Sequence, residues 1–255
     1  MVVISLLTDF GLADTYVGQV KGAILTVAPA ATLVDVTHAV TAQDVRAGAF
    51  LLWSAVEAFP AGTIHLAVVD PGVGSARRAI AIRSRRGDVC VGPDNGLLGP
   101  AAERLGGRDL VVELTEPRYW RPSPSRTFHG RDVFGPVAAH LANGVPLEAV
   151  GQPIADPVEL HLPEARGLEG EVIHVDTFGN LVTNLPATSL PARFQAKVQG
   201  HTAQAAPHYQ AVAPGGLLAL VGSAGLLEIS VRDGSAAAVT GATRGTPVAV
   251  EAADG

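Results

Sequence analysis

The first 150 residues alternate short β-branched runs with longer alanine-rich segments, and this alternation constrains the fold more than any other feature of the chain. The β-branched runs predict strands at 2–7, 33–36, 64–69, 79–82 and 89–91. The alanine-rich segments predict helices at about 15–27, 43–58 and 133–142. Strands that alternate with helices are typical of a sheet covered by helices. We therefore expect an N-terminal α/β sandwich-like domain with a central, mostly parallel sheet.

The pattern changes after residue 150. Three prolines, Pro153, Pro157 and Pro163, interrupt regular structure and indicate a linker. Short β-prone segments separated by Gly, Pro and Asn turns then predict strands at 172–175, 181–185, 217–221, 227–231 and 247–250. The expected organisation is an α/β domain at 1–155, a linker at 156–169 and a smaller all-β domain at 170–255.

Charge and cysteine content exclude several classes of function. The formal net charge is −6 and no long basic cluster occurs, which argues against nucleic acid or an anionic membrane as a partner. The single cysteine, Cys90, permits no intrachain disulfide and no paired-cysteine metal site. No apolar run is long enough to span a bilayer, and the first predicted strand is reached without the basic n-region or cleavage signature typical of a signal peptide. We expect a cytoplasmic protein that acts on a small molecule.

Two segments concentrate chemistry-bearing side chains. Thr127–Phe134 holds an imidazole, a guanidinium and a carboxylate around a glycine. The imidazole is that of His129, directly beside the glycine. The run 64–69 ends directly in Asp70, and Arg77 follows seven residues later. A lone histidine more often packs than catalyses, and many Asp–Arg pairs are structural, but the glycine that allows close approach of a ligand favours a site. For Asp132 the favoured interpretation is a local ion pair at a helix N-terminus.

Further polar residues follow other predicted strands. Asp9, Asp35 with His38, and Asn95 all come near strand ends, where ligands of open α/β sheets collect, so a shared cleft is expected. A carboxylate such as Asp9 can accept two hydrogen bonds from a sugar diol. The alternative role for Asp9 is a helix cap, although Asp14 is better placed for capping.

In the second half, the segment 176–180 combines Asp176, Phe178 and Asn180 after a strand, and it can hold an ammonium group and stack a purine. A β-hairpin turn explains the same segment equally well. The segment 222–225, which includes Ser223, is typical of a turn that enters a strand.

Taken together these segments resemble the S-adenosyl-L-methionine hydroxide adenosyltransferases, which are related to the bacterial fluorinase and chlorinase. The resemblance covers nearly the whole chain. The motifs that carry it are Thr8-Asp9-Phe10-Gly11, Asp35-Val36-Thr37-His38, Asp70-Pro71-Gly72-Val73-Gly74 with Arg77, Gly92-Pro93-Asp94-Asn95-Gly96, Thr127 to Asp132, Asp176 to Asn184 and Gly222 to Ile229.

The resemblance implies an α/β domain joined to a smaller β domain, in a homotrimer whose active sites lie between subunits. It implies cleavage of S-adenosyl-L-methionine (SAM) by water at ribose C5′ to give adenosine and L-methionine, without a metal or cofactor. Asp70, Arg77 and His129 match the residues associated with this chemistry. The substrate-binding candidates are Asp9 for the ribose diol, Phe128 and Gly130 beside His129, Asp176 and Ser223 for the methionine moiety, and Phe178, Asn180 and Tyr209 for adenine.

The residue type at position 70 distinguishes hydrolysis from halogenation, and the residue type at position 224 concerns recognition of the methionine end. The halide-using relatives look to have tyrosine where Asp70 stands, so the resemblance favours water as the nucleophile. Ala224 stands where the fluorinase carries an arginine toward the substrate carboxylate. Two other functions stay open: a metal-dependent nucleotide phosphatase that uses Asp9, Asp35, His38, Asp70 and His129 as ligands, and a non-catalytic SAM- or adenosine-binding protein.

Overall fold

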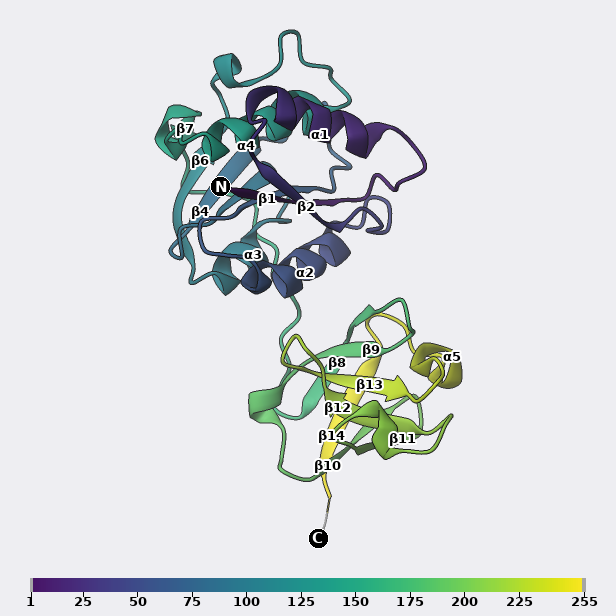
Figure 1. Cartoon of the computed structure of the whole chain (residues 1–255). Coiled ribbons are helices and arrows are strands. Elements are labelled where there is room, and N and C mark those ends of the chain that lie inside the picture. The colour runs from purple at the N-terminus through teal and green to yellow at the C-terminus, as the bar shows by residue number, and fades with distance from the viewer. Residues whose placement is uncertain (1, 254–255) are drawn as a thin grey trace. The chain divides into compact units, whose positions relative to one another are not determined.

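A computed structural model describes residues 2–253, and the chain divides into two compact units, Met1–Leu162 and Pro163–Gly255, here called unit 1 and unit 2 (Figure 1). Unit 1 is α/β and unit 2 is a β-barrel, so the predicted fold class is confirmed. Among residues 2–253, no helix combines the length and the apolar character needed to cross a membrane.

A mixed sheet forms the centre of unit 1. Its strand order is β2-β1-β3-β5-β4-β6-β7. Pairing is parallel from β2 to β5 and antiparallel from β5 to β7. The strands are β1 (Val3–Thr8), β2 (Thr32–Thr37), β3 (Ile64–Val68), β4 (Ala79–Ser84), β5 (Val89–Pro93), β6 (Arg108–Glu113) and β7 (Gln152–Pro153). The parallel half brings the carboxyl ends of β1 and β3 side by side.

Helices cover both faces of this sheet. α1 (Tyr16–Val27) and α4 (Gly135–Ala142) lie on one face, and α2 (Val45–Ala55) and α3 (Gly99–Arg104) lie on the other (Figure 1). Side chains alternate between the two faces along each strand: Leu6 packs in the core with α1 and α4, whereas Leu7 packs in the core with α2 and α3. Burial on both faces explains why β3 and β5 are mostly apolar in sequence.

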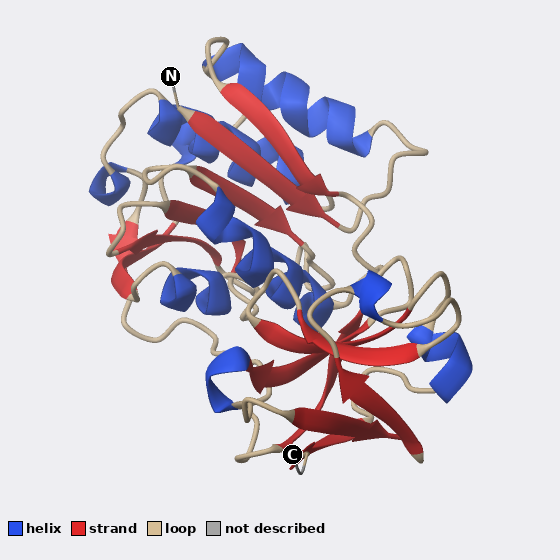
Figure 2. Cartoon of the chain, turned by 60° about the horizontal axis from the view of Figure 1, so that its bottom comes forward, coloured by secondary structure: helices blue, strands red, loops and turns tan. Residues whose placement is uncertain are grey.

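Unit 2 closes into a seven-stranded barrel among the described residues (Figure 2). Its order is β10-β11-β12-β13-β9-β8-β14, with the barrel closed by pairing of β14 with β10. The strands are β8 (Glu169–Val175), β9 (Leu181–Pro186), β10 (Phe194–Val198), β11 (His201–Ala205), β12 (Leu217–Val221), β13 (Leu226–Val231) and β14 (Pro247–Ala252). A short helix, α5 (Ala236–Thr240), packs on β13. Closure leaves few free strand edges.

The helical segment predicted at 133–142 begins three residues earlier, at Gly130, and its first turn is not α-helical. A π-helical turn, Gly130–Phe134, precedes α4. Pro136 has no N–H, so the carbonyl of Asp132 lacks its helical donor and instead accepts a hydrogen bond from Arg121 N at 2.9 Å. The Gly135 N–H bonds Gly130 O five residues back, which widens the turn. Such π turns occur frequently at functional sites.

Candidate functional site

A cavity of about 250 Å³ opens in unit 1 where β1 and β3 end. Its lining residues come from the loops after these two strands, from the loop before α2 and from the start of the π turn. They are Asp9, Phe10, Gln43, Val68, Asp70, Pro71, Val73, Thr127, Phe128, His129 and Gly130. The cavity therefore lies at the carboxyl ends of adjacent parallel strands, where α/β sheets bind ligands.

Arg77 joins two of the predicted site residues. Its Nε lies 3.0 Å from both carboxylate oxygens of Asp70, and its Nη2 lies 2.5 Å from Asp70 Oδ2. The same Nη2 lies 2.8 Å from His129 Nδ1. The side chains of Arg77 and Asp70 are 10% and 5% exposed. The structure thus assembles Asp70, Arg77 and His129 into one chain of hydrogen bonds, with Arg77 behind the cavity and the other two at its wall.

This contact sets the tautomer of His129. A guanidinium can only donate hydrogen bonds, so Nδ1 of His129 is an acceptor and the neutral ring carries its proton on Nε2. Burial lowers the pKa of His129, and the charge of Arg77 lowers it further against the opposing effects of Asp70 and Asp132. The imidazole is therefore neutral at neutral pH and presents an N–H donor.

The loop that carries His129 is anchored from behind by Asp132, which is 2% exposed. Its Oδ1 accepts from Arg131 Nε at 2.7 Å and its Oδ2 accepts from Ser125 N at 2.9 Å. Burial alone would raise the pKa of Asp132, but the hydrogen bonds from Arg131 and Ser125 hold it below its usual value. The predicted ion pair with Arg131 is confirmed, and through Ser125 it also anchors the loop before His129.

A glycine allows the same loop to pass close to the Asp70 turn. Gly74 has φ +79°, and a Cβ at this position would lie 2.5 Å from Arg126 O. The turn itself closes through Val73 N and Asp70 O, 3.2 Å apart. Any side chain at Gly74 would push the two segments apart, and with them Asp70 and His129.

Asp9 is fixed by the backbone of a distant loop. Its Oδ2 accepts a hydrogen bond from Gln43 N at 2.8 Å. The helix-cap interpretation is wrong both for Asp9 and for Asp14, because α1 begins after Thr15 and no side chain caps it. The carboxylate of Asp9 instead lines the cavity.

The structure does not bring Asp35, His38 or Asn95 to the lining of this cavity, so the expected shared cleft is smaller than predicted. Asp35 Oδ2 lies 2.6 Å from Lys21 Nζ. The buried His38 shares a 2.8 Å hydrogen bond with Thr8 Oγ1 and, through its backbone carbonyl, accepts from Gly11 N. These residues support the turn that carries Asp9. Asn95 Nδ2 donates to the carbonyl of Val69, which follows β3 and precedes Asp70.

Aromatic rings form a further part of the cavity. Phe10 and Phe128 pack edge to face with centroids 5.7 Å apart, and Tyr16 packs on Phe128 at 5.3 Å. Phe10 was not predicted as a site residue, because an aromatic side chain beside a strand end has no local signal that separates packing from binding. Ring faces attract cations, and the Phe128 ring already has Arg131 over it, with Cζ 5.0 Å from the centroid. Phe10 is the cavity ring that can contact a positively charged ligand.

Unit 2 has its own cavity of about 470 Å³, lined by Phe178, Asn180, Tyr209, Gln210, Val231, Arg232, Asp233 and Gly234. Phe178 is 77% exposed, which is unusual for phenylalanine, and Tyr209 is 44% exposed. Both flank the cavity with Asn180. The arrangement offers aromatic faces and an amide, which suit a purine base.

Asp176 has a structural role in the hairpin between β8 and β9. Its Oδ1 accepts from Phe178 N at 2.9 Å and from Asn180 N at 2.8 Å, and its Oδ2 accepts from Asn180 Nδ2 at 2.9 Å. The predicted hairpin turn is therefore confirmed. These bonds also hold Phe178 and Asn180 at the cavity, while Asp176 itself is not among the lining residues.

Glu228 was not predicted as a site residue, because a lone glutamate within an apolar strand gives no clear signal. It is 8% exposed and accepts hydrogen bonds from Tyr209 OH and Ser230 Oγ, both at 2.7 Å. The bond to Glu228 and partial burial raise the pKa of Tyr209 to about 12. Ser223 lies in the predicted turn between β12 and β13 and does not line the cavity.

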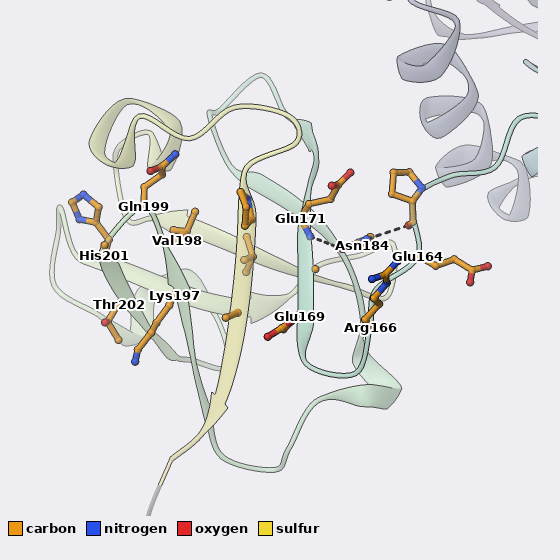
Figure 3. Close-up of a pocket in the computed structure, with 16 residues that line it drawn as sticks. Glu164, Arg166, Glu169, Glu171, Asn184, Lys197, Val198, Gln199, His201 and Thr202 are labelled. Atoms are coloured by element: carbon orange, nitrogen blue, oxygen red, sulfur yellow. Dashed lines mark hydrogen bonds between the residues drawn. The ribbon is translucent and has the colours of Figure 1, made fainter.

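The largest of these cavities, about 910 Å³, is a groove on the barrel (Figure 3). The side-chain amide of Asn184 in this groove already makes hydrogen bonds within the protein. Its Oδ1 accepts from Glu171 N and its Nδ2 donates to Pro163 O. Lys197 is paired with Glu251 at 2.6 Å. These polar groups stabilise the barrel itself, so the groove is not the candidate site.

Two of the five residues considered as metal ligands are already paired with cations of the protein. Arg77 contacts both oxygens of Asp70, and Lys21 contacts Asp35. Within the described part of the chain, no group of three or more His, Cys, Asp or Glu side chains could hold a metal ion. The phosphatase alternative is not supported by this arrangement.

Comparison with known proteins gives related enzymes over nearly the full length. A relative from Salinispora arenicola named (R)-S-adenosyl-L-methionine hydrolase is 46% identical and covers 98% of this chain and 97% of its own length. One of the same name from Thermus thermophilus is 42% identical, covering 95% of this chain and 96% of its own. A fluorinase from Actinoplanes sp. is 30% identical over 74% of this chain and 73% of its own.

A crystal structure of an uncharacterized conserved protein from Thermotoga maritima matches with a TM-score of 0.91 at 38% identity, covering 97% of this chain and 100% of that one. Two family models match the chain, the SAM hydroxide adenosyltransferase N-terminal domain over residues 4–151 and the C-terminal domain over residues 170–249. The chain belongs to the SAM hydroxide adenosyltransferase family.

Proposed function

We infer that this chain hydrolyses S-adenosyl-L-methionine to adenosine and L-methionine. The observation that carries the inference is the Asp70–Arg77–His129 assembly at a cavity of a chain that belongs to this family. In the reaction, a water oxygen bonds to C5′ while the C5′–S bond breaks and its electron pair goes to sulfur. Methionine leaves as a neutral thioether, and one proton of the water is released.

The charge of the unit 1 cavity suits a sulfonium substrate. Asp70 is neutralised by Arg77 and His129 is neutral, so the charge of Asp9 is left uncompensated by any ion pair among the described residues. Phe10 adds a ring face that attracts a cation, whereas the Phe128 ring already has Arg131 over it. The departing thioether is neutral, so this attraction is lost with product formation.

We assign Asp70 as the proton acceptor. His129 has no free lone pair, because Nδ1 accepts from Arg77 and Nε2 carries the proton. Asp70 retains a lone pair on Oδ1, which accepts only from Arg77 Nε, whereas Oδ2 accepts from both Nε and Nη2. A water held between them donates to the Asp70 carboxylate and accepts from His129 Nε2–H, and Arg77 fixes both partners.

The remaining residues bind substrate in this proposal. Asp9 accepts hydrogen bonds from the ribose diol, and Phe128 and Gly130 form the wall at C5′. Phe178, Asn180 and Tyr209 hold adenine, and Asp176 and Ser223 contact the methionine moiety. Asp176 serves mainly by holding the hairpin that presents Phe178.

We further propose a homotrimer in which the unit 1 cavity of one subunit and the unit 2 cavity of another form one active site. Each cavity offers half of what SAM requires: carboxylates and the triad in unit 1, and aromatic faces with an amide in unit 2. A substrate as long as SAM needs both sets of contacts.

Mixed oligomers test this arrangement. Asp70→Asn and Phe178→Ala should each be nearly inactive alone, since one removes the proton acceptor and the other removes an exposed ring. Co-expression of the two variants in equal amounts should restore about one quarter of the parental activity. In a randomly assembled trimer, about one site in four combines an intact unit 1 from one variant with an intact unit 2 from the other. Sedimentation should give a trimer. No recovery in a mixed trimer would place the whole site within one chain.

The activity itself is tested with purified protein and SAM separated into its two sulfonium epimers. Because the relatives are named for the (R) form, we expect faster turnover of that epimer, with adenosine and methionine formed in equal amounts. Chromatography measures both products, with and without excess chelator and chloride. Activity abolished by the chelator would favour the phosphatase alternative, and binding of SAM without turnover would favour a binding protein.

A further inference from the structure

Gln43 has an unusual backbone conformation beside the unit 1 cavity. Its φ is +65°, in the left-handed region that glycine and asparagine adopt more readily than other residues. It directly precedes Asp44, the N-cap of α2, whose Oδ1 accepts from Ala47 N at 3.0 Å. Backbone strain of this kind persists where the surrounding structure enforces it, and it clusters at ligand sites.

The strained conformation directs the Gln43 N–H at Asp9. The hydrogen bond to Asp9 Oδ2 is 2.8 Å long. Asp9 Oδ1 makes no hydrogen bond to residues 2–253 and remains available at the cavity. A glycine would supply the same N–H without strain, so the backbone contact alone does not explain a glutamine here.

The side chain of Gln43 is exposed and the residue lines the cavity with Asp9. Its carboxamide has no hydrogen-bond partner within the described part of the chain. An amide offers both a donor and an acceptor, whereas Asp9 offers acceptors only. A vicinal diol presents two hydroxyl groups that each donate and accept, so the two side chains together match it better than either does alone.

We propose that Gln43 is a specificity-determining residue whose carboxamide hydrogen-bonds the ribose diol together with Asp9 Oδ1. The proposal rests on the proposed function for the identity of the nucleoside. The Gln43 N–H orients the Asp9 carboxylate, and the Gln43 amide binds the second hydroxyl. The Gln43 N–H contacts Asp9 and the residue lines the cavity, so in this proposal both groups of Gln43 serve the same sugar.

The test uses Gln43→Gly, which keeps the N–H and the backbone conformation but removes the carboxamide. Calorimetry should show adenosine binding weakened about tenfold, as expected for one hydrogen bond, and unchanged binding of 2′,3′-dideoxyadenosine. KM for SAM should rise by a similar factor with little change in kcat. Gln43→Asn, which keeps an amide and tolerates this conformation, should bind adenosine more tightly than Gln43→Gly.

Gln199→Gly is the matched control. Gln199 is also an exposed glutamine with positive φ, +48°, but it lies in the turn between β10 and β11 of unit 2. Both glycine variants relieve the same strain, so both should keep or raise the parental melting temperature, while Gln199→Gly binds adenosine as the parent does.

Equal weakening for adenosine and dideoxyadenosine would overturn the proposal, as would a melting temperature of Gln43→Gly well below that of the parent, since either points to a structural role. The nucleoside-binding result is independent of turnover. If the parent binds adenosine but leaves SAM intact, the proposed hydrolysis fails while the role of Gln43 is still decided by calorimetry.

Discussion

Replacing Asp70 by asparagine is expected to lower kcat for SAM hydrolysis by about 10³-fold, because the variant keeps the shape of the side chain but loses its basicity. The carboxylate contacts Arg77 through both oxygens and lies at the cavity wall, where water can reach it. KM should change little, since the proton acceptor contributes in the transition state rather than to substrate binding. Single-turnover kinetics with SAM measures the chemical step directly.

Variants of His129 separate the two candidate proton acceptors. His129→Gln retains an N–H donor but has no basic nitrogen, whereas His129→Leu retains neither. If His129 acts as a donor, His129→Gln should keep at least about tenfold more kcat than His129→Leu. If His129 were the base, both variants would be equally impaired and Asp70→Asn would lose less activity.

The control is Asp109→Asn, which weakens another Asp–Arg pair of unit 1. Asp109 Oδ2 lies 2.7 Å from Arg83 Nε on the surface, away from the cavity lining. This variant should keep parental kcat and KM. A large loss in Asp109→Asn would mean that general destabilisation, rather than the loss of a base, accounts for the effect at Asp70.

The parts of the fold that the sequence predicts are those whose apolar pattern follows from burial. β1, β3 and β5 are buried on both faces, so each is mostly apolar, although β1 contains Ser5 and β3 contains His65. β11 was missed because its sequence, His-Thr-Ala-Gln-Ala, is exposed at most positions and has no apolar run. The π turn at Gly130 was also missed, since it depends on Pro136 and on a distant donor, Arg121 N.

In the candidate site, too, some residues can be predicted from the sequence and others cannot. Asp70, Arg77 and His129 can be suspected from sequence because each lies in a polar, glycine-containing segment beside a predicted strand or helix. Gln43 cannot, because what distinguishes it is a backbone angle and a hydrogen bond to a residue 34 positions away. Contacts of this kind arise only when β1 and the segment before α2 are brought together by the sheet.

A second network of unit 1, formed by Ser5, His65 and Asp88, resembles a hydrolytic Ser–His–Asp set in composition only. All three residues are at most 1% exposed, so no substrate reaches them. Ser5 Oγ lies 2.7 Å from His65 Nδ1, and His65 Nε2 lies 3.6 Å from Asp88 Oδ1, too far for a strong hydrogen bond. Asp88 is instead paired with Arg86 at 2.7 Å.

This network makes the stability of unit 1 depend on pH. Burial, with a smaller contribution from Arg86 and against the effect of Asp88, lowers the pKa of His65 from 6.5 to about 4. As the pH falls below 6.5, His65 becomes protonated in the unfolded chain, but in the folded unit it stays neutral until about pH 4. The free energy of unfolding is therefore unaffected by protonation of His65 above pH 6.5. It decreases by about 3 kcal/mol in total as the pH falls from 6.5 to 4.

His65→Gln removes this proton linkage. At pH 7 the variant should be less stable than the parent because it loses packing and the bond with Ser5, but the difference should shrink by about 3 kcal/mol between pH 7 and pH 4. This difference in the free energy of unfolding is measured by urea titration with tryptophan fluorescence as the signal. The two tryptophans, Trp53 and Trp120, both lie in unit 1, so the signal reports on that unit. The exposed His161→Gln should keep the parental pH dependence. A constant difference between His65→Gln and the parent across this range would mean that His65 is protonated in the folded unit as readily as in the unfolded chain.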